Sequence, residues 1–476
     1  MRSTPAQQAA RRAGAGATAQ LQDIEGEALL ARLEGVPFTW WHTRARLVMG
    51  SATFLDAFDA LSLAFVMPAL IGLWHMSTVE VGVLIGVGYV GQLFGALLFS
   101  RLAENFGRVP GASAATAMMS VMSLGCAIAG NFPALMCCRL VQGIGVGGEM
   151  PVAATYISEL SLAAGRGRFF MLYEMIFPIG LMATGQIGSL LVPLLGWQVM
   201  FLAGGLPGLV VAVLIWRLPE SPRWLISRGR LDQAQSIIEE IEASTKDRVA
   251  PTDVLDRTSA GTRPPAAPGP AQPGQWEELL SPFYRGRTLI AWSLWASAYF
   301  VANGLNNWMP TLYKTVYGLG LQESLSAAAL TNVAQVILLV ICAFCIDRIG
   351  RRNWMIAVFV AGALLLATLG AGASGDVRHV MVLATLAYGA IGSANAVLYL
   401  YTPEIYPTRM RAIGTGLATS WLRLASAAGP PIVGLILHRS SISSVFLMFA
   451  GVSVFGALAA SQMIATERKR LEDVSP

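Results

Sequence analysis

Long apolar runs, separated by short polar or basic loops, make up most of the chain. A helix that crosses the hydrocarbon core of a bilayer needs about 20 predominantly apolar residues. Windows of that length predict twelve membrane-spanning helices, six on either side of a polar break. They lie at residues 47–73, 79–101, 111–130, 134–156, 168–192, 198–217, 287–312, 322–346, 353–373, 379–401, 411–437 and 442–465. The pattern therefore predicts an all-α membrane protein with two six-helix bundles.

Polar stretches mark the expected domain boundaries. The sequence predicts an N-terminal segment at 1–46, a first bundle at 47–217, a linker at 218–285, a second bundle at 286–465 and a tail at 466–476. Residues 221–241 of the linker mix aliphatic and charged side chains at helical spacing, which indicates surface helices. Residues 250–275 are rich in Pro, Gly and Ala and predict a disordered tether, whereas residues 19–36 predict another short amphipathic helix.

Composition excludes the main classes of soluble protein. The chain is 54% hydrophobic and 13% charged, against roughly 45–50% and about 25% in soluble domains. Its net charge of +5 is spread over short loops, which argues against a nucleic-acid surface. The five cysteines all lie in apolar runs, unlike the cysteines of a disulfide framework. No nucleophile–base set and no metal-ligand spacing is present, so we expect no enzyme activity, cofactor or metal.

Arginines indicate the side of the membrane on which each loop lies. Cytoplasmic loops of membrane proteins carry an excess of Lys and Arg. One set of connections holds most of the basic residues, whereas the opposite set holds only Lys314, Arg378 and Arg439. We therefore expect the Arg-rich loops, and with them both termini, on the cytoplasmic side.

The two halves repeat each other, with a Gly-Arg loop after the second and eighth spans and a Tyr-x-x-Glu motif at the end of the fourth and tenth. An Arg beside a carboxylate at a helix end can form a charge-assisted pair in one state and lose it in another. The alternative is that these arginines only fix the topology. The predicted gating residues are Glu104, Arg108, Glu159 and Arg168 in the first half and Asp347, Arg351, Glu404 and Arg411 in the second.

Three motifs resemble the major facilitator superfamily, whose pattern covers residues 47–465. They are the loop at 100–108, its second copy at 347–352, and Arg139-Leu-Val-Gln142-Gly-Ile-Gly145 in the fourth span. The first loop departs from the family pattern, because Ser, Glu and Asn replace the usual Gly, Asp and Arg. The resemblance implies two six-helix bundles related along the membrane normal, with the substrate site between them.

Narrower motifs resemble the bacterial niacin porters, which are relatives of the synaptic-vesicle SV-type transporters. These motifs are GGEMPVA at 147–153 and LYTPEIYPTR at 400–409. Asp56-Ala-Phe-Asp59 resembles the aromatic-acid/proton symporters. PESPRWL at 219–225 is similar to the sugar porters, whose other signatures are absent.

The resemblance implies a secondary active transporter that imports a small aromatic carboxylate by alternating access, nicotinate first. Benzoate-type aromatic acids are the alternative cargo, and a non-transporting membrane receptor on the same fold stays open. The resemblance also implies that the protein is a monomer in a bacterial-type inner membrane, with protons and a small molecule as its partners.

Six ionisable residues lie inside the predicted spans: Asp56, Asp59, Arg139, Glu149, Glu174 and Arg423. Each costs about 2.5–3.5 kcal/mol at the centre of a membrane helix, so each needs a partner or a function. Arg423 is the predicted anchor for the substrate carboxylate, because a guanidinium binds a carboxylate through two parallel hydrogen bonds and stacks on aromatic rings. An internal ion pair is the alternative.

Asp56 and Asp59 are the predicted proton carriers. Their i, i+3 spacing places them on one helix face, and two close carboxylates in a medium of low dielectric cannot easily both ionise. We therefore expect proton coupling through this pair, with Glu149 and Glu174 as further candidates. The alternative is a packing role in which each carboxylate pairs with a buried arginine.

Amides and aromatic side chains complete the predicted pocket. They are Trp295, Asn303 and Asn307 in the seventh span, Asn395 and Tyr399 in the tenth, Tyr173 in the fifth and Trp197 near the outer end of the sixth. Asn can bond a pyridine nitrogen or a carboxylate oxygen, and Tyr offers a hydroxyl and a ring for stacking. For the tenth span and Trp197, the resemblance also implies ligand-facing positions, and the alternative for Trp197 is a place in the outer interfacial belt of aromatic residues. The alternative for the amides is hydrogen bonding between helices.

Overall fold

The computed structural model describes residues 24–33, 35–37, 39–160, 173, 175–244, 276–372, 376–407, 410–464 and 466. This part of the chain is almost entirely helical and contains no strand. The predicted tether at 250–275 lies outside it, as do Arg168 and Glu174 and the side chain of Asp347.

Twelve long helices confirm the predicted spans, with ends that mostly differ by a few residues. The first six are α2 (Trp40–Trp74), α3 (Thr78–Phe106), α4 (Arg108–Ala127), α5 (Phe132–Leu160), α7 (Ile176–Leu195) and α8 (Gln198–Trp216). The second six are α11 (Arg285–Thr315), α12 (Leu321–Ile349), α13 (Arg351–Gly372), α14 (Val377–Glu404), α15 (Arg411–Arg439) and α16 (Ile442–Ser461). Ten of these helices are long and apolar enough to cross a membrane by composition alone. The other two, α5 and α11, bury their polar residues inside the bundles.

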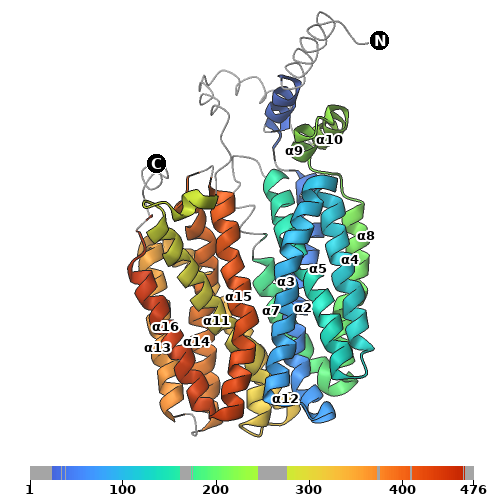
Figure 1. The fold of residues 1–476 in the computed structure, drawn as a ribbon. Helices are drawn as coiled ribbons and strands as arrows, with labels where there is room; N and C mark the ends of the chain where they lie inside the picture. The colour runs from blue at the N-terminus through green and yellow to red at the C-terminus, as the bar shows by residue number, and fades with distance from the viewer. Residues whose placement is uncertain are drawn as a thin grey trace, which may run out of the picture.

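The two halves pack alike (Figure 1). In the first half α3 packs on α5 and α4 on α8, and in the second half α12 packs on α14 and α13 on α16. Across the boundary between the halves, α3 packs on α15, α7 on α12 and α2 on α11. The α3–α15 and α7–α12 contacts correspond to each other, because each joins the second helix of one half to the fifth helix of the other, and α2–α11 joins the first helices of both halves. This pattern is expected for halves related by an approximate two-fold axis.

Short helices cover one end of the first half. The predicted surface helices at 221–241 are confirmed as α9 (Pro222–Ser227) and α10 (Leu231–Ala243), drawn above the bundle in Figure 1. Residues 24–33 are also helical. Leu33 of this segment and Ile238 of α10 are buried in the same apolar core. A shorter 3₁₀ helix, η1 (Trp276–Leu280), precedes α11.

The halves meet tightly at the end opposite α9 and α10. There, Thr78 Oγ1 donates to the carbonyl of Gly434 (3.0 Å) and Lys314 Nζ donates to the carbonyl of Pro68 (2.8 Å). Gly82 and Gly86 of α3 lie against the backbone of α15, whose nearest residues are Ala427, Pro430 and Pro431. We call these five residues the outer seam, after the side of the membrane on which the sequence predicts this end to lie. Ion pairs between described residues all stay within one half.

Candidate substrate site

Arg423 lies inside the second half, on α15. Its Nη1 donates one long hydrogen bond, 3.5 Å, to the carbonyl of Thr419, and it forms no ion pair within the described part of the chain. The guanidinium interacts electrostatically with the hydroxyls of Tyr299 on α11 and Tyr399 on α14. It also interacts electrostatically with the carboxylate of Asp56 on α2, across the boundary between the halves.

Aromatic rings from two helices form one side of this site. Trp295 stacks on Tyr299 with ring centroids 5.6 Å apart, and Tyr399 meets Trp295 edge-on at 4.7 Å. Trp295 is fully buried and donates from Nε1 to Thr402 Oγ1 (2.9 Å). Trp295 therefore contacts both tyrosines, and both tyrosines interact electrostatically with Arg423.

The predicted amides differ in how far their hydrogen bonds are satisfied. Asn303 Nδ2 donates to Ser426 Oγ on α15 (2.6 Å). Asn307 Nδ2 donates to the Tyr89 hydroxyl of α3 (3.2 Å) and to the carbonyl of Asn303. Asn395 Oδ1 is buried and accepts no hydrogen bond from a described residue. Two amides thus serve helix–helix contacts in this state, and Asn395 retains an acceptor.

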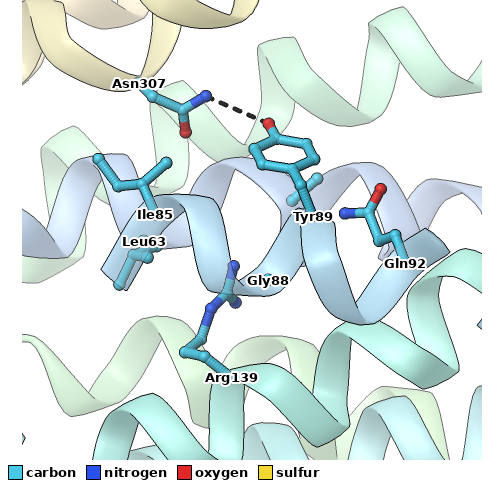
Figure 2. Close-up of a pocket in the computed structure, with 8 residues that line it drawn as sticks. Leu63, Ile85, Gly88, Tyr89, Gln92, Arg139 and Asn307 are labelled. Carbon is cyan, nitrogen blue, oxygen red and sulfur yellow. Dashed lines mark hydrogen bonds between the residues drawn. The ribbon is translucent and has the colours of Figure 1, made fainter. Parts of the chain in front are cut away.

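A small cavity of about 10 Å³ lies beneath the outer seam. Figure 2 shows Tyr89 and Asn307 hydrogen-bonded at one end of it, with the Arg139 guanidinium at the other. Gln92 lies beside Tyr89 on the same helix. A cavity of this size is close to the minimum for one water molecule.

The two carboxylates of α2 are both buried but have different partners. Asp59 accepts from Ser123 Oγ (3.1 Å) and from Gln142 Nε2 (2.5 Å). Arg139 Nη1 reaches the carbonyl of Asp59 (3.4 Å) and Gln142 Oε1 (2.7 Å). Asp56 is 3% exposed and makes no hydrogen bond with the described chain. The two carboxylates interact electrostatically with each other, as their spacing predicts.

Three further predicted residues lie away from Arg423. Glu149 accepts from Thr53 Oγ1 (3.1 Å), and the same hydroxyl contacts the Tyr173 hydroxyl at 2.6 Å. Trp197 lies at the outer end of α8, where it packs edge-on against Trp74 with ring centroids 5.8 Å apart. The structure does not bring Trp197 together with the other predicted pocket residues.

Predicted gating residues form ion pairs inside each half. Arg108 Nη2 lies 2.9 Å from Glu159 Oε1, and Arg351 Nη2 lies 3.2 Å from Glu404 Oε1. Arg411 donates from Nε to the carbonyl of Tyr406 (3.1 Å). These described contacts do not cross between the halves.

The backbone carbonyl of Glu104, rather than its exposed side chain, accepts hydrogen bonds, from Trp224 Nε1 (2.9 Å) and from Arg228. In the second half Glu404 also accepts from Thr466 Oγ1 (2.5 Å).

Sequence reasoning missed Glu220, which closes the start of α4. Its carboxylate accepts from the backbone amides of Arg108 (3.0 Å) and Val109 (3.2 Å). Burial raises the pKa of Glu220. The sequence feature that could have indicated this contact is Gly107. Its φ of +116° and its lack of a Cβ let the carboxylate of Glu220 approach the start of α4. Tyr89 was missed as well, because a tyrosine in an apolar run is not distinguishable from a packing residue.

Comparison with known proteins supports the same architecture. A family described as "Sugar (and other) transporter" matches residues 30–476. The niacin transporter NiaP of Acinetobacter baylyi is 32% identical over 450 residues, which cover 94% of this chain and 99% of that protein. The 4-hydroxybenzoate transporter PcaK of Pseudomonas aeruginosa is 27% identical, covering 89% of this chain and 92% of that protein.

More distant relatives include the synaptic vesicle 2-related protein of Xenopus laevis, which is 24% identical and covers 93% of this chain and 82% of that protein. A crystal structure of a D-xylose-proton symporter superposes with a TM-score of 0.70 at 19% identity, covering 90% of this chain and 98% of that one. The chain therefore belongs to the sugar (and other) transporter family of the major facilitator superfamily, and is a multi-pass membrane transporter rather than an enzyme.

Proposed function

We propose that the chain imports a small aromatic carboxylate, nicotinate first, by alternating access and together with protons. The observation that carries this proposal is Arg423, whose guanidinium lies inside the bundle without an ion-pair contact to a described residue. A cation inside a membrane protein is costly unless an anion compensates it. A monoanionic carboxylate supplies the missing charge and matches the planar geometry of the guanidinium.

The neighbouring tyrosines favour an aromatic cargo. Tyr299 and Tyr399 lie near Arg423, and Trp295 holds both rings in place through stacking and edge contacts. A planar ring whose carboxylate binds Arg423 would meet these tyrosines face-on or edge-on, which are the favourable arrangements of aromatic pairs. The name of the niacin transporter, 32% identical over nearly the whole chain, supports nicotinate as the first cargo to test.

Proton coupling rests on the buried carboxylates of α2. Asp56 and Asp59 lie inside the first bundle, and Arg423 lies inside the second. Import of an anion alone would move negative charge against the usual membrane potential, at about 2.3 kcal/mol per charge per 100 mV. A proton carried with the anion removes that cost.

Hydroxylated aromatic acids are the second candidate, favoured by Asn395. Its buried Oδ1 lacks a donor among the described residues, and a ring hydroxyl would supply one, whereas a pyridine nitrogen would not. The relatives named as 4-hydroxybenzoate and gallate transporters fit this alternative.

Uptake into proteoliposomes tests the proposal. Radiolabelled nicotinate is supplied with and without an inward proton gradient, and benzoate, 4-hydroxybenzoate, nicotinamide and glucose serve as competitors. We expect saturable, gradient-stimulated uptake that nicotinate or an aromatic acid blocks and glucose does not. Binding without flux would favour a receptor, and no binding of any aromatic acid by folded protein would overturn the proposal.

A matched pair of variants tests the role of Arg423. Arg423→Gln should abolish uptake because it removes the charge. Arg439→Gln, an exposed position on the same helix, should leave uptake within about twofold, since surface changes away from special features are nearly neutral. Equal uptake by the Arg423 variant and the wild type would exclude this anchor.

A further inference from the structure

The two carboxylates of α2 are held in unlike ways. Asp59 has both carboxylate oxygens hydrogen-bonded, one to Ser123 of α4 and one to Gln142 of α5. Arg139, also on α5, lies beside Gln142 and reaches the carbonyl of Asp59. All of these partners belong to the first half, so Asp59 keeps its surroundings when the halves move as rigid bodies.

Asp56 lacks such partners. Its side chain is 3% exposed, and none of the described residues donates a hydrogen bond to it. The positive group that it faces is Arg423, which belongs to the other half and is not in direct ion-pair contact with it. A buried carboxylate without hydrogen-bond donors must either hold a proton or rely on a nearby positive charge.

Among the described residues, the titratable groups that interact electrostatically with Asp56 are Asp59 on the same helix, Tyr89 on α3 and Arg423 on α15. The helices packed on α2 also carry Arg139 and Glu149 on α5 and Tyr299 on α11. The described parts of α7 and α8, which also pack on α2, contain no titratable side chain. Arg139 is already engaged with Gln142 and the backbone of Asp59. Arg423 is therefore the positive charge on which the ionised form of Asp56 depends.

We propose that Asp56 and the substrate carboxylate compete for Arg423, so that Asp56 takes up a proton from solution when the substrate binds. This inference rests on the proposed function, because it uses Arg423 as the substrate anchor. One guanidinium carries one charge and cannot compensate two buried carboxylates. The substrate anion and one proton therefore bind as a neutral pair, and the proton leaves Asp56 when the substrate leaves Arg423.

The two aspartates then have separate roles. Asp56 is the group whose proton occupancy follows the substrate, since the positive charge that compensates it within the described part of the chain is shared with the cargo. Asp59 stays in its hydrogen-bonded network with Arg139 and does not exchange its proton in step with the cargo. Because linkage is reciprocal, the proton must strengthen substrate binding by the same factor by which the substrate strengthens proton binding.

Calorimetry on the purified full chain in nanodiscs measures this linkage. Nicotinate is titrated at one pH in several buffers with different enthalpies of ionisation. The slope of the observed enthalpy against the buffer enthalpy gives the number of protons taken up for each nicotinate bound. We expect close to one proton for the wild type, close to none for Asp56→Asn, and close to one for Asp59→Asn.

Each alternative result has one meaning. Nicotinate binding without proton uptake by the wild type would overturn the inference and leave the proposed cargo intact. Loss of proton uptake in Asp59→Asn but not in Asp56→Asn would assign the proton to the other aspartate and also overturn it. Failure of the folded wild type to bind nicotinate or any other aromatic acid would instead overturn the proposed function.

A second measurement needs no variant and guards against misfolding. On the alkaline side, the Kd of the wild type for nicotinate should rise by up to about tenfold per pH unit, as expected when one proton binds with the ligand. A Kd that is independent of pH from 5.5 to 8.5 would contradict the inference. Intrinsic fluorescence during thermal unfolding shows whether each variant is folded.

Discussion

Replacing Gly82 by alanine should weaken the closed state of the outer seam. A Cβ at this position would lie 2.5 Å from the carbonyl oxygen of Pro430 and 2.9 Å from Cα of Pro431. Both are backbone atoms of α15, so neither can rotate away. Non-bonded carbon atoms are best separated by about 3.5–4.0 Å, so the two helices must move apart by roughly 1 Å.

The expected shift follows from this clash. Overpacking in a well-packed contact costs about 1–3 kcal/mol. The clash exists only while the seam is closed, so the full cost disfavours the closed state and shifts the equilibrium by about 5- to 150-fold toward the outward-open state. In a helix without such a contact, replacing glycine by alanine would stabilise the helix by about 1 kcal/mol. The sign of the effect therefore distinguishes the seam from ordinary helix propensity.

Cysteine labelling from the outside measures the shift. A cysteine replaces Ala427, whose backbone carbonyl lies against Gly86 in the seam. This cysteine reacts with a membrane-impermeant maleimide in the presence and absence of Gly82→Ala. We expect at least about fivefold faster labelling with the alanine, together with slower net uptake. Gly451→Ala is the control, because nothing lies within 4 Å of a Cβ at that position. Equal labelling rates in the Gly82 and Gly451 variants would refute the reasoning.

Three further predictions concern other contacts. Tyr89→Phe removes a hydrogen bond to Asn307 that joins the two halves and is worth about 0.5–1.5 kcal/mol. The closed state should therefore be less favoured, and the same cysteine should be labelled about 2- to 12-fold faster. An unchanged labelling rate would contradict this prediction. Burial raises the pKa of Glu220 above its ordinary value of 4.5, so the folded state binds that proton more tightly and loses this stabilisation as the pH rises above 4.5. Glu220→Gln should therefore flatten the dependence of Tm on pH between 4.5 and 7, and identical profiles would exclude Glu220 as the cause. Ile238→Ala should lower the free energy of unfolding by about 2–5 kcal/mol, because the site is fully buried. Arg32→Ala should lower it by less than about 1 kcal/mol, because the ion pair of Arg32 is exposed. A larger loss for Arg32→Ala than for Ile238→Ala in thermal unfolding would contradict the packing argument.

The sequence predicts the helices of this fold better than the contacts of its site. Twelve apolar windows give twelve helices, because a membrane segment must satisfy its backbone internally and does so as a helix. Arg423 is a candidate from the sequence alone because a charge inside a span is costly and needs a partner or a function. Its neighbours were harder to predict. Trp197 was expected near the outer end of the sixth span, and it packs there on Trp74 rather than with the other predicted pocket residues.

Hydrogen bonds between distant helices account for the rest of the difference. Asn303 and Asn307 are polar residues in a span, which suggests either a ligand or another helix as partner, and only the three-dimensional arrangement assigns their amide groups to Ser426 and Tyr89. Glu220 lies in a loop whose charge is unremarkable in sequence. Its role depends on the start of α4, more than 100 residues earlier in the chain, coming within hydrogen-bonding distance.

The outer seam has a consequence for how such a transporter diversifies. Pro430 and Pro431 have no amide hydrogen to donate, so the carbonyls four residues earlier in α15 lose their usual helical partner. One of these is the carbonyl of Ala427, which faces Gly86. Closure at this place thus joins backbone to backbone and involves few side-chain functional groups. If Arg423 anchors the cargo as we propose, substitutions around it would change which molecule is recognised while the closing step stays the same, so that one moving scaffold could serve many cargoes.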